Sequence, residues 1–278
     1  MINIIIGKRS NLTQRLLYAF ENSIAISSDN IVEGMGGIDW SSHNVNLILN
    51  QFHPATQLND LSLPIDYINN AIGNTAKILE FIRSKNININ KIIYTSSSSV
   101  YGSNKSCHER DIYAPVNLHS ALKVANEKLV IKFCQNANID YTIARVFNMY
   151  GGADNFSIIS KIINCYKKNQ TLTLVNKGQS IRDFIHIDDV VNIYHKILSI
   201  QNLPVINVAS GKGESILSIL NHLEKNQIIL KTDNIISNEI SKSISNNSKL
   251  LDIMNGYQFI DVKDYLVTCV KKLPKVLA

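Results

Sequence analysis

The sequence lacks any apolar run near the ~18 residues that a membrane-spanning helix needs, and its N-terminus lacks the regions of a signal peptide. Its four cysteines (Cys107, Cys134, Cys165 and Cys269) lie far apart, with no C-x-x-C pair and no Cys/His spacing that suits zinc. Only 12 of 278 residues are glycine, which excludes a collagen-like chain, and the 45% hydrophobic content excludes intrinsic disorder. We therefore expect a soluble cytoplasmic protein with reduced thiols, no bound metal and no membrane partner.

A block of charge of one sign is also missing. The chain has 28 Lys+Arg against 22 Asp+Glu, a net charge of +6, and its basic residues are scattered. Nucleic-acid binding requires a clustered basic patch, so we expect no nucleic-acid partner. A mildly basic enzyme with phosphorylated substrates has the same composition.

Short apolar runs alternate with longer amphipathic segments in the N-terminal half, which is typical of βαβ units. The pattern predicts strands at residues 2–6, 23–26, 45–49, 91–94 and 141–145, and helices after Gly7 and over 68–84 and 119–136. Beyond residue 148 it predicts helices at 156–168, from 188 and at 216–224, and strands at 172–175 and 205–208. Periodicity is weakest in 231–249.

This order of elements predicts an α/β fold. We expect a Rossmann-like, doubly wound parallel sheet in residues 1–148, which would bind a dinucleotide. Residues 149–278 would form a smaller mixed α/β C-terminal lobe for the substrate, with some segments returning to the first domain. A ligand crevice is expected at the carboxyl ends of the strands.

Glycine is scarce where a dinucleotide site would need it. The loop Gly7-Lys8-Arg9-Ser10-Asn11-Leu12-Thr13 follows the first strand, and Ser10 and Thr13 stand at two positions of its G-x-x-G-x-x-G spacing. Small residues there allow backbone N–H groups and a helix N-terminus to approach a pyrophosphate. The alternative is an ordinary strand–helix turn in which Ser10 or Asn11 caps the helix.

The end of the second strand bears on the choice of cofactor. Asp29 would suit an unphosphorylated ribose, whereas Arg9 and the Ser27 hydroxyl would suit a 2′-phosphate. We expect NADP(H) in preference to NAD(H). The expected cofactor contacts are Gly7, Arg9, Ser10, Asn11, Leu12, Ser27 and Asp29.

A second group of polar residues ends the strand near residue 94 and opens the next long helix. Residues 94–102 read Tyr-Thr-Ser-Ser-Ser-Ser-Val-Tyr-Gly, and residues 119–123 read His-Ser-Ala-Leu-Lys. A serine hydroxyl at a strand end can bind a substrate hydroxyl or ketone, and a lysine in the facing helix can bind a cofactor ribose.

These residues resemble the extended short-chain dehydrogenase/reductase family, the NAD-dependent epimerase/dehydratase group that acts on nucleotide sugars. Four further stretches match family motifs in order: residues 70–75 (N-x-x-G-T), 145–151 (R-x-x-N-x-Y-G), 182–189 (R-D-[FY]-I-H-V-x-D) and 207–211 (N-V-G-S-G). The resemblance extends over residues 2 to about 265.

The resemblance implies a catalytic set. Ser97 matches the family's catalytic Ser/Thr and Lys123 its catalytic lysine, which also contacts the cofactor, but His119 replaces the tyrosine of Y-x-x-x-K. Either His119 is the acid–base group, or Tyr113 or a water replaces it, or the protein only binds its ligands. Alternatively, His119 caps the helix.

The resemblance also implies a nucleotide-diphosphate sugar as substrate, bound by Ser98, Asn148, Arg182 and Lys242. Arg182 could instead pair with Asp183 or Asp188. The family also implies a homodimer through the helices near 70–84 and 119–136, and a place in polysaccharide biosynthesis.

Departures from the family pattern narrow the reaction. Residues 97–99 are serines where 4,6-dehydratases have T-D-E, and Ser99 stands where C3/C5 epimerase-reductases have cysteine. Only residues 30–44 separate the second and third strands, where larger 4-epimerases have an insertion. We expect an NAD(P)-dependent oxidoreductase that reduces a 4-ketosugar; the alternatives are a 4-epimerase with bound NAD and a catalytically silent binding protein.

Overall fold

The computed structural model describes residues 1–40, 44–50 and 63–273, which form two compact units. Unit 1 comprises Met1–Gly102, Ile112–Val146 and Val191–Ile206. Unit 2 comprises Ser103–Asp111, Phe147–Val190 and Asn207–Ala278.

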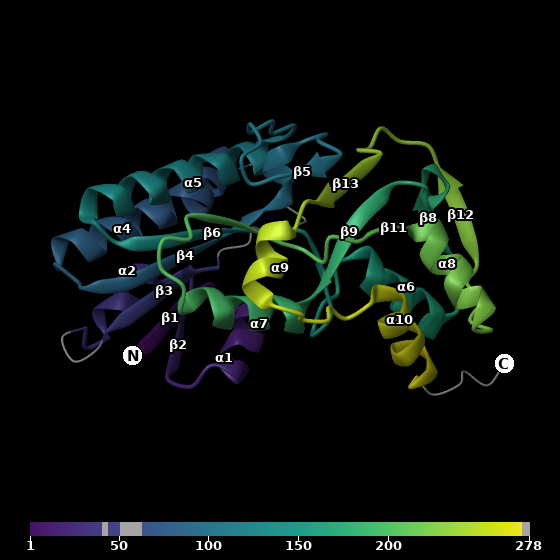
Figure 1. The fold of residues 1–278 in the computed structure, drawn as a ribbon, viewed down its shortest axis with the longest axis horizontal. Helices are drawn as coiled ribbons and strands as arrows, with labels where there is room; N and C mark the ends of the chain where they lie inside the picture. The colour runs from purple at the N-terminus through teal and green to yellow at the C-terminus, as the bar shows by residue number, and fades with distance from the viewer. Residues whose placement is uncertain (41–43, 51–62, 274–278) are drawn as a thin grey trace. The chain divides into compact units, whose positions relative to one another are not determined.

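A six-stranded sheet organises unit 1 (Figure 1), in the order β10-β6-β4-β3-β1-β2. Its strands are β1 (Ile2–Ile6), β2 (Ser23–Ile26), β3 (Val45–Leu49), β4 (Ile89–Ser97), β6 (Asp140–Val146) and β10 (Val205–Val208). Four successive pairs from β2 to β6 are parallel. All five residues of β3 are buried, as expected for a strand covered on both faces. The predicted doubly wound parallel sheet is confirmed.

The helices of unit 1 cover both faces of this sheet, with α4 and α5 on one face and α1 and α7 on the other (Figure 1). They are α1 (Asn11–Ala19), α2 (Ile31–Gly36), α3 (Pro64–Ile68), α4 (Asn74–Ser84), α5 (Leu118–Ala137) and, from Val191 on, α7 (Ile187–Leu198). The helix expected over 68–84 is interrupted by a π-helical turn, η2 (Asn69–Gly73). Leucine and isoleucine side chains from α1 and α4, including Leu12, Leu16 and Ile78, are fully buried.

The strand order determines where a ligand can bind in unit 1. The chain runs from β1 to β2 on one side and then to β3 on the other side of β1. This reversal opens a crevice at the carboxyl ends of β1 and β3. The β1–α1 turn, Asn50 after β3 and Ser97 at the end of β4 all lie at this edge.

Unit 2 contains a mixed sheet in the order β11-β9-β13-β5, with β7 also paired to β9, and a two-stranded sheet β12-β8. The strands are β5 (Ser106–Cys107), β7 (Asn148–Tyr150), β8 (Leu172–Val175), β9 (Ile181–His186), β11 (Gly213–Ser215), β12 (Thr232–Ile235) and β13 (Lys242–Ser245). The helices are α6 (Ile158–Lys168), α8 (Ile216–Lys225), α9 (Ser248–Met254) and α10 (Val262–Lys271). Residues 231–249, whose periodicity is weak, thus contribute β12 and β13.

Candidate functional site

Ser97 ends β4 and begins a 3₁₀ turn, η3 (Ser98–Tyr101). Its Oγ accepts the Ser99 N–H at 3.2 Å, so its own hydroxyl proton can be donated to a substrate oxygen. Gly102 closes the turn with φ 58°, and a Cβ there would lie 2.0 Å from the Ala114 carbonyl oxygen. The end of the turn therefore requires glycine, and Ser98 occupies its first position.

His119 and Lys123 lie one helical turn apart in the first part of α5, which packs on β4. The cap of this helix is Asn117, whose side chain accepts the Ser120 N–H at 2.9 Å while the Ser120 hydroxyl accepts the Asn117 N–H. The alternative that His119 caps the helix is therefore wrong, because Asn117 already performs this role.

Lys123 is buried, with only 2% of its surface exposed. Its Nζ donates to the Thr95 carbonyl oxygen at 2.9 Å and lies 5.2 Å from the centre of the Tyr94 ring. Burial lowers the pKa of Lys123 to about 8, against the opposing effect of the Glu127 carboxylate. The ammonium is thus positioned directly below the end of β4.

The charge state of His119 follows from its surroundings. Burial lowers the pKa of the imidazole to about 4, and the Lys123 ammonium acts in the same direction. His119 is therefore neutral near pH 7. A neutral imidazole donates from one ring nitrogen and accepts at the other, so it can pass a proton but holds no charge of its own.

The structure contains a buried ion pair between Glu127 and Arg145 that the sequence did not predict. Glu127 accepts hydrogen bonds from Ser96, from the Tyr113 hydroxyl at 2.9 Å and from Arg145 Nη2 at 2.8 Å. Arg145 also donates to the Tyr101 hydroxyl at 2.8 Å. Two features of the sequence pointed to this pair: Glu127 lies one helical turn after Lys123, and Arg145 is the arginine of the R-x-x-N-x-Y-G match.

This network affects the alternative role of Tyr113. Its hydroxyl donates to the buried Glu127 carboxylate, and burial together with that negative charge raises the pKa of Tyr113 to about 12. The phenol is held in the network and gives up its proton reluctantly. Of the two side chains, His119 is the better candidate for proton transfer.

The β1–α1 turn retains the features that a pyrophosphate requires. Gly7 has φ 110°, which favours glycine, and Ser10 caps α1 by accepting the Thr13 N–H at 3.1 Å. Asn50 donates to both hydroxyls, to Ser10 Oγ at 2.9 Å and to Thr13 Oγ1 at 2.8 Å. The side chains that replace glycine are thus directed toward the interior, so the turn fits a dinucleotide.

The other cofactor candidates border this turn. Arg9 Nη2 pairs with Asp29 Oδ1 at 2.9 Å, and the Asp29 N–H donates to Ser27 Oγ at 3.3 Å. The side chains of Arg9 and Asp29 are 75% and 58% exposed, so this ion pair is weak and open to a ligand. Asn11 begins α1 partly exposed, whereas Leu12 is buried and could contribute only its backbone N–H.

Of the substrate candidates, Ser98 lies in unit 1, and the other three lie in unit 2. The Asn148 amide donates to the Asp183 carbonyl oxygen at 3.0 Å, which places Asn148 beside the strand that carries Arg182. Arg182 pairs with Glu239 at 3.3 Å, and not with Asp183 or Asp188 as the alternative supposed. Asp183 is buried and accepts hydrogen bonds from residues 210, 211 and 245 instead.

Lys242 is separated from Arg182. In the parallel pairing of β13 with β9, Lys242 stands opposite Ile181, and Ser243 stands opposite Arg182. Because side chains alternate between the faces of a sheet, Lys242 and Arg182 point to opposite faces. The register therefore does not support the expectation that both bind one diphosphate, which rested on a loose match in 231–249.

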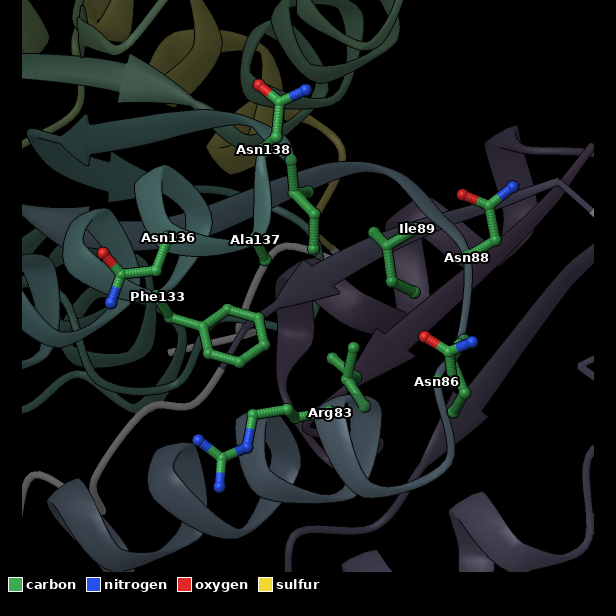
Figure 2. A pocket seen from close by; sticks show the side chains of 11 residues that line it. Arg83, Asn86, Asn88, Ile89, Phe133, Asn136, Ala137 and Asn138 are labelled. Carbon is green, nitrogen blue, oxygen red and sulfur yellow. The ribbon is translucent and has the colours of Figure 1, made fainter.

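The pocket in Figure 2 lies elsewhere, between the C-terminal ends of α4 and α5 and the starts of β4 and β6. The amides of Asn86, Asn88, Asn136 and Asn138 are spread around its rim and do not converge (Figure 2). It is at the opposite edge of the sheet from the crevice described above. We do not consider it the functional site.

Two negative findings concern only the part of the chain that the structure describes. Among those residues no group of His, Cys, Asp or Glu is arranged to hold a metal ion. No helix within them is long and apolar enough to cross a membrane.

Comparison with known proteins gives consistent matches. Residues 41–209 match the model of the NAD dependent epimerase/dehydratase family. The chain is 30% identical over 212 residues to GDP-6-deoxy-D-talose 4-dehydrogenase of Aggregatibacter actinomycetemcomitans, covering 72% of this chain and 70% of that protein. It is 32% identical over 154 residues to dTDP-D-glucose 4,6-dehydratase of Dictyostelium discoideum, covering 50% of this chain but only 35% of that protein.

The fold also matches solved structures. A UDP-glucuronic acid 4-epimerase from Bacillus cereus, in complex with UDP-glucuronic acid and NAD, superposes with a TM-score of 0.82. The match covers 99% of this chain and 100% of that one at 21% sequence identity. At this identity the likeness concerns the fold.

Proposed function

Because the chain belongs to the NAD-dependent epimerase/dehydratase family, whose members are enzymes, we propose that it is an NAD(P)-dependent nucleotide-sugar oxidoreductase that reduces a 4-keto group. The match to GDP-6-deoxy-D-talose 4-dehydrogenase carries this proposal. Dehydrogenation at C4 is the reverse of reduction of a 4-ketosugar. That relative is matched over most of its length, unlike the 4,6-dehydratase.

Ser97, His119 and Lys123 would form the catalytic set. Ser97 would donate a hydrogen bond to the C4 oxygen, since its Oγ already accepts the Ser99 N–H. The neutral imidazole of His119 would pass a proton to the same oxygen, and the Lys123 ammonium would orient the nicotinamide ribose and supply the positive field. The bound nicotinamide would supply the hydride.

The serine run argues against two other family reactions. Elimination of water from a sugar needs an acid and a base beside C4, and residues 97–99 offer no carboxyl group. Epimerisation at C3 or C5 needs a comparable base, and Ser99 is a poor one. Hydride transfer at C4 requires neither a carboxyl group in residues 97–99 nor a base at the position of Ser99.

We propose NADP(H) as the preferred cofactor. Gly7, Ser10, Asn11 and Leu12 would bind the pyrophosphate through the turn and the N-terminus of α1. A 2′-phosphate could replace the Asp29 carboxylate as the partner of Arg9 and accept from the Ser27 hydroxyl, because the existing ion pair is exposed and weak.

The substrate would be a nucleotide-diphosphate sugar. Arg182 is the main diphosphate candidate, because a guanidinium has five N–H donors and the structure uses two of its nitrogens, one for Ile181 and one for Glu239. Asn148, on the neighbouring strand, and Ser98 would add hydrogen bonds. We also propose a cytoplasmic homodimer assembled through α4 and α5, which light scattering of the purified protein would test.

The direct test uses GDP-6-deoxy-D-talose with NADP⁺ and follows the appearance of NADPH. We expect turnover by the wild type, and about a hundredfold or greater loss of kcat in Ser97→Ala and His119→Phe. Absence of turnover would overturn the proposal, and cofactor binding without turnover would favour the catalytically silent binding protein. A His119→Tyr variant faster than the wild type would show that the histidine is not an adapted acid–base group.

A 4-epimerase is the second candidate, and the Arg9–Asp29 pair favours it. An arginine already paired with a carboxylate offers less to a 2′-phosphate, whereas Asp29 suits the free ribose of NAD. Incubation with UDP-glucuronic acid and no added cofactor discriminates the two. Formation of its C4 epimer without net NADH would identify an epimerase.

A further inference from the structure

The β1–α1 turn has a side-chain support that comes from another strand. Asn50 directly follows β3, is fully buried, and reaches Ser10 and Thr13 with two hydrogen bonds of 2.9 and 2.8 Å. Ser10 and Thr13 are the residues that replace glycine at the second and third positions of the loop. Both replacements are therefore in contact with the same buried amide.

The two hydrogen bonds act on the cap of α1. Ser10 is the N-cap: its carbonyl accepts the Gln14 N–H at 3.1 Å, and its Oγ accepts the Thr13 N–H. Asn50 binds that same Oγ, so it ties the first turn of the helix to the end of β3. Thr13 is fully buried, and without Asn50 its hydroxyl would lose its short 2.8 Å contact.

The position of this contact in the fold gives it a functional consequence. The strand order reverses at β1, which lies between β2 and β3, and the crevice for the dinucleotide opens between the carboxyl ends of β1 and β3. Asn50 joins the two sides of that crevice. A loop of glycines leaves the turn to be ordered by the ligand, whereas side chains tied to β3 order it beforehand.

We propose that Asn50 is a positioning residue for the cofactor: it compensates for the missing glycines by fixing the phosphate-binding turn in its binding conformation. This inference rests on the proposed cofactor-dependent function. It implies that the sequence around Ser10 is an adapted loop and not a degraded one.

The chain provides a matched control in Asn46, on the same strand and four residues earlier. Asn46 is 3% exposed. Its side-chain amide donates a hydrogen bond to Asn3 Oδ1 at 3.1 Å and accepts one from the Asn90 amide at 2.8 Å. Asn46→Ala removes a comparable buried amide network far from the turn. It should lower the free energy of unfolding without changing cofactor affinity.

The test measures the Kd of NADPH and of NADH by calorimetry, and unfolding by urea, for the wild type, Asn46→Ala and Asn50→Ala. We expect Asn50→Ala to raise the Kd of the preferred cofactor about tenfold or more, as loss of two hydrogen bonds allows. Asn46→Ala should leave that Kd within about twofold of the wild type. Equal Kd values for wild type and Asn50→Ala would overturn the inference while leaving the proposed function intact.

A second series tests the compensation directly, and its first variant does not depend on Asn50→Ala folding. Thr13→Val keeps the shape of the side chain, removes its hydroxyl and should weaken binding several-fold. The triple variant Ser10→Gly/Thr13→Ala/Asn50→Ala restores small residues and should recover most of the lost affinity. A triple variant that binds less than Asn50→Ala would refute compensation, and failure of the wild type to bind either cofactor would refute both this inference and the proposed function.

Discussion

The buried Lys123 gives the sharpest test of the site's electrostatics, because its charge affects stability as well as catalysis. Burial lowers its pKa from 10.5 to about 8, so the unfolded chain binds more protons than the folded chain between these values. Stability from this group therefore rises with pH across that interval. Below pH 8, where Lys123 is charged in both states, its burial costs the folded state about 3 kcal/mol relative to the unfolded chain. This figure takes about 1.4 kcal/mol for each unit by which the pKa is lowered.

The perturbation is Lys123→Met, which keeps the length of the side chain and removes its titration. Between pH 7 and pH 9 the wild type should gain about 1 kcal/mol of unfolding free energy relative to the variant. Exposed Lys132→Met, on the same helix, is the control for replacing a lysine of α5 by methionine. Comparing the wild type with the variant cancels the pH dependence that all other titrating groups contribute equally to both proteins.

Urea denaturation at several pH values provides the measurement, with the midpoint and the slope m both recorded. Constant m values would confirm that the variant changes stability and not the extent of unfolding. Parallel curves for wild type and Lys123→Met from pH 7 to pH 9 would refute the reasoning, since they would mean that the lysine is solvated in the folded protein.

Three further predictions follow from other contacts. Glu127→Gln should lower the free energy of unfolding by about 3 kcal/mol or more, because it leaves the buried Arg145 guanidinium without its counter-ion. The control, exposed Glu80→Gln, should change the free energy of unfolding little. Equal effects of the two substitutions in a urea titration would contradict this prediction. Arg9→Ala should raise the Kd of NADPH about tenfold and leave that of NADH nearly unchanged in calorimetry; a loss shared by both cofactors would exclude a contact with the 2′-phosphate. The value of kcat/KM should be constant between about pH 5 and 7.5, where His119 is neutral and Lys123 is charged, and should fall above about pH 8. A rise in kcat/KM above about pH 8 would show that the Lys123 ammonium is not needed.

The sequence was sufficient for most of unit 1 because its signals are local. Buried parallel strands appear as short apolar runs, and the predicted strand 45–49 coincides with β3. The helix expected over 119–136 is α5, which runs from Leu118 to Ala137. The strand β9 escaped prediction because its motif residues are polar and charged, which hides the alternation of a strand.

Contacts between residues far apart in the sequence could not be predicted for a different reason. Asn50 and Ser10 are 40 residues apart, and Arg182 and Glu239 are 57 apart, so no periodicity relates them. The position of Lys242 relative to Arg182 could not be predicted for the same reason, because a shift of one residue in strand register moves a side chain to the other face of the sheet.

The sequence by itself determined the fold class and the family and singled out Ser97, His119 and Lys123 as candidates, because short motifs and apolar periodicity are properties of neighbouring residues. The scarcity of glycine in the first loop left an ordinary strand–helix turn as the alternative to a cofactor site. Only the tertiary structure showed that Ser10 and Thr13 are held by Asn50, and that His119 is not the helix cap. These properties depend on which strands become neighbours and on how deeply each polar group is buried, and chain folding alone decides both.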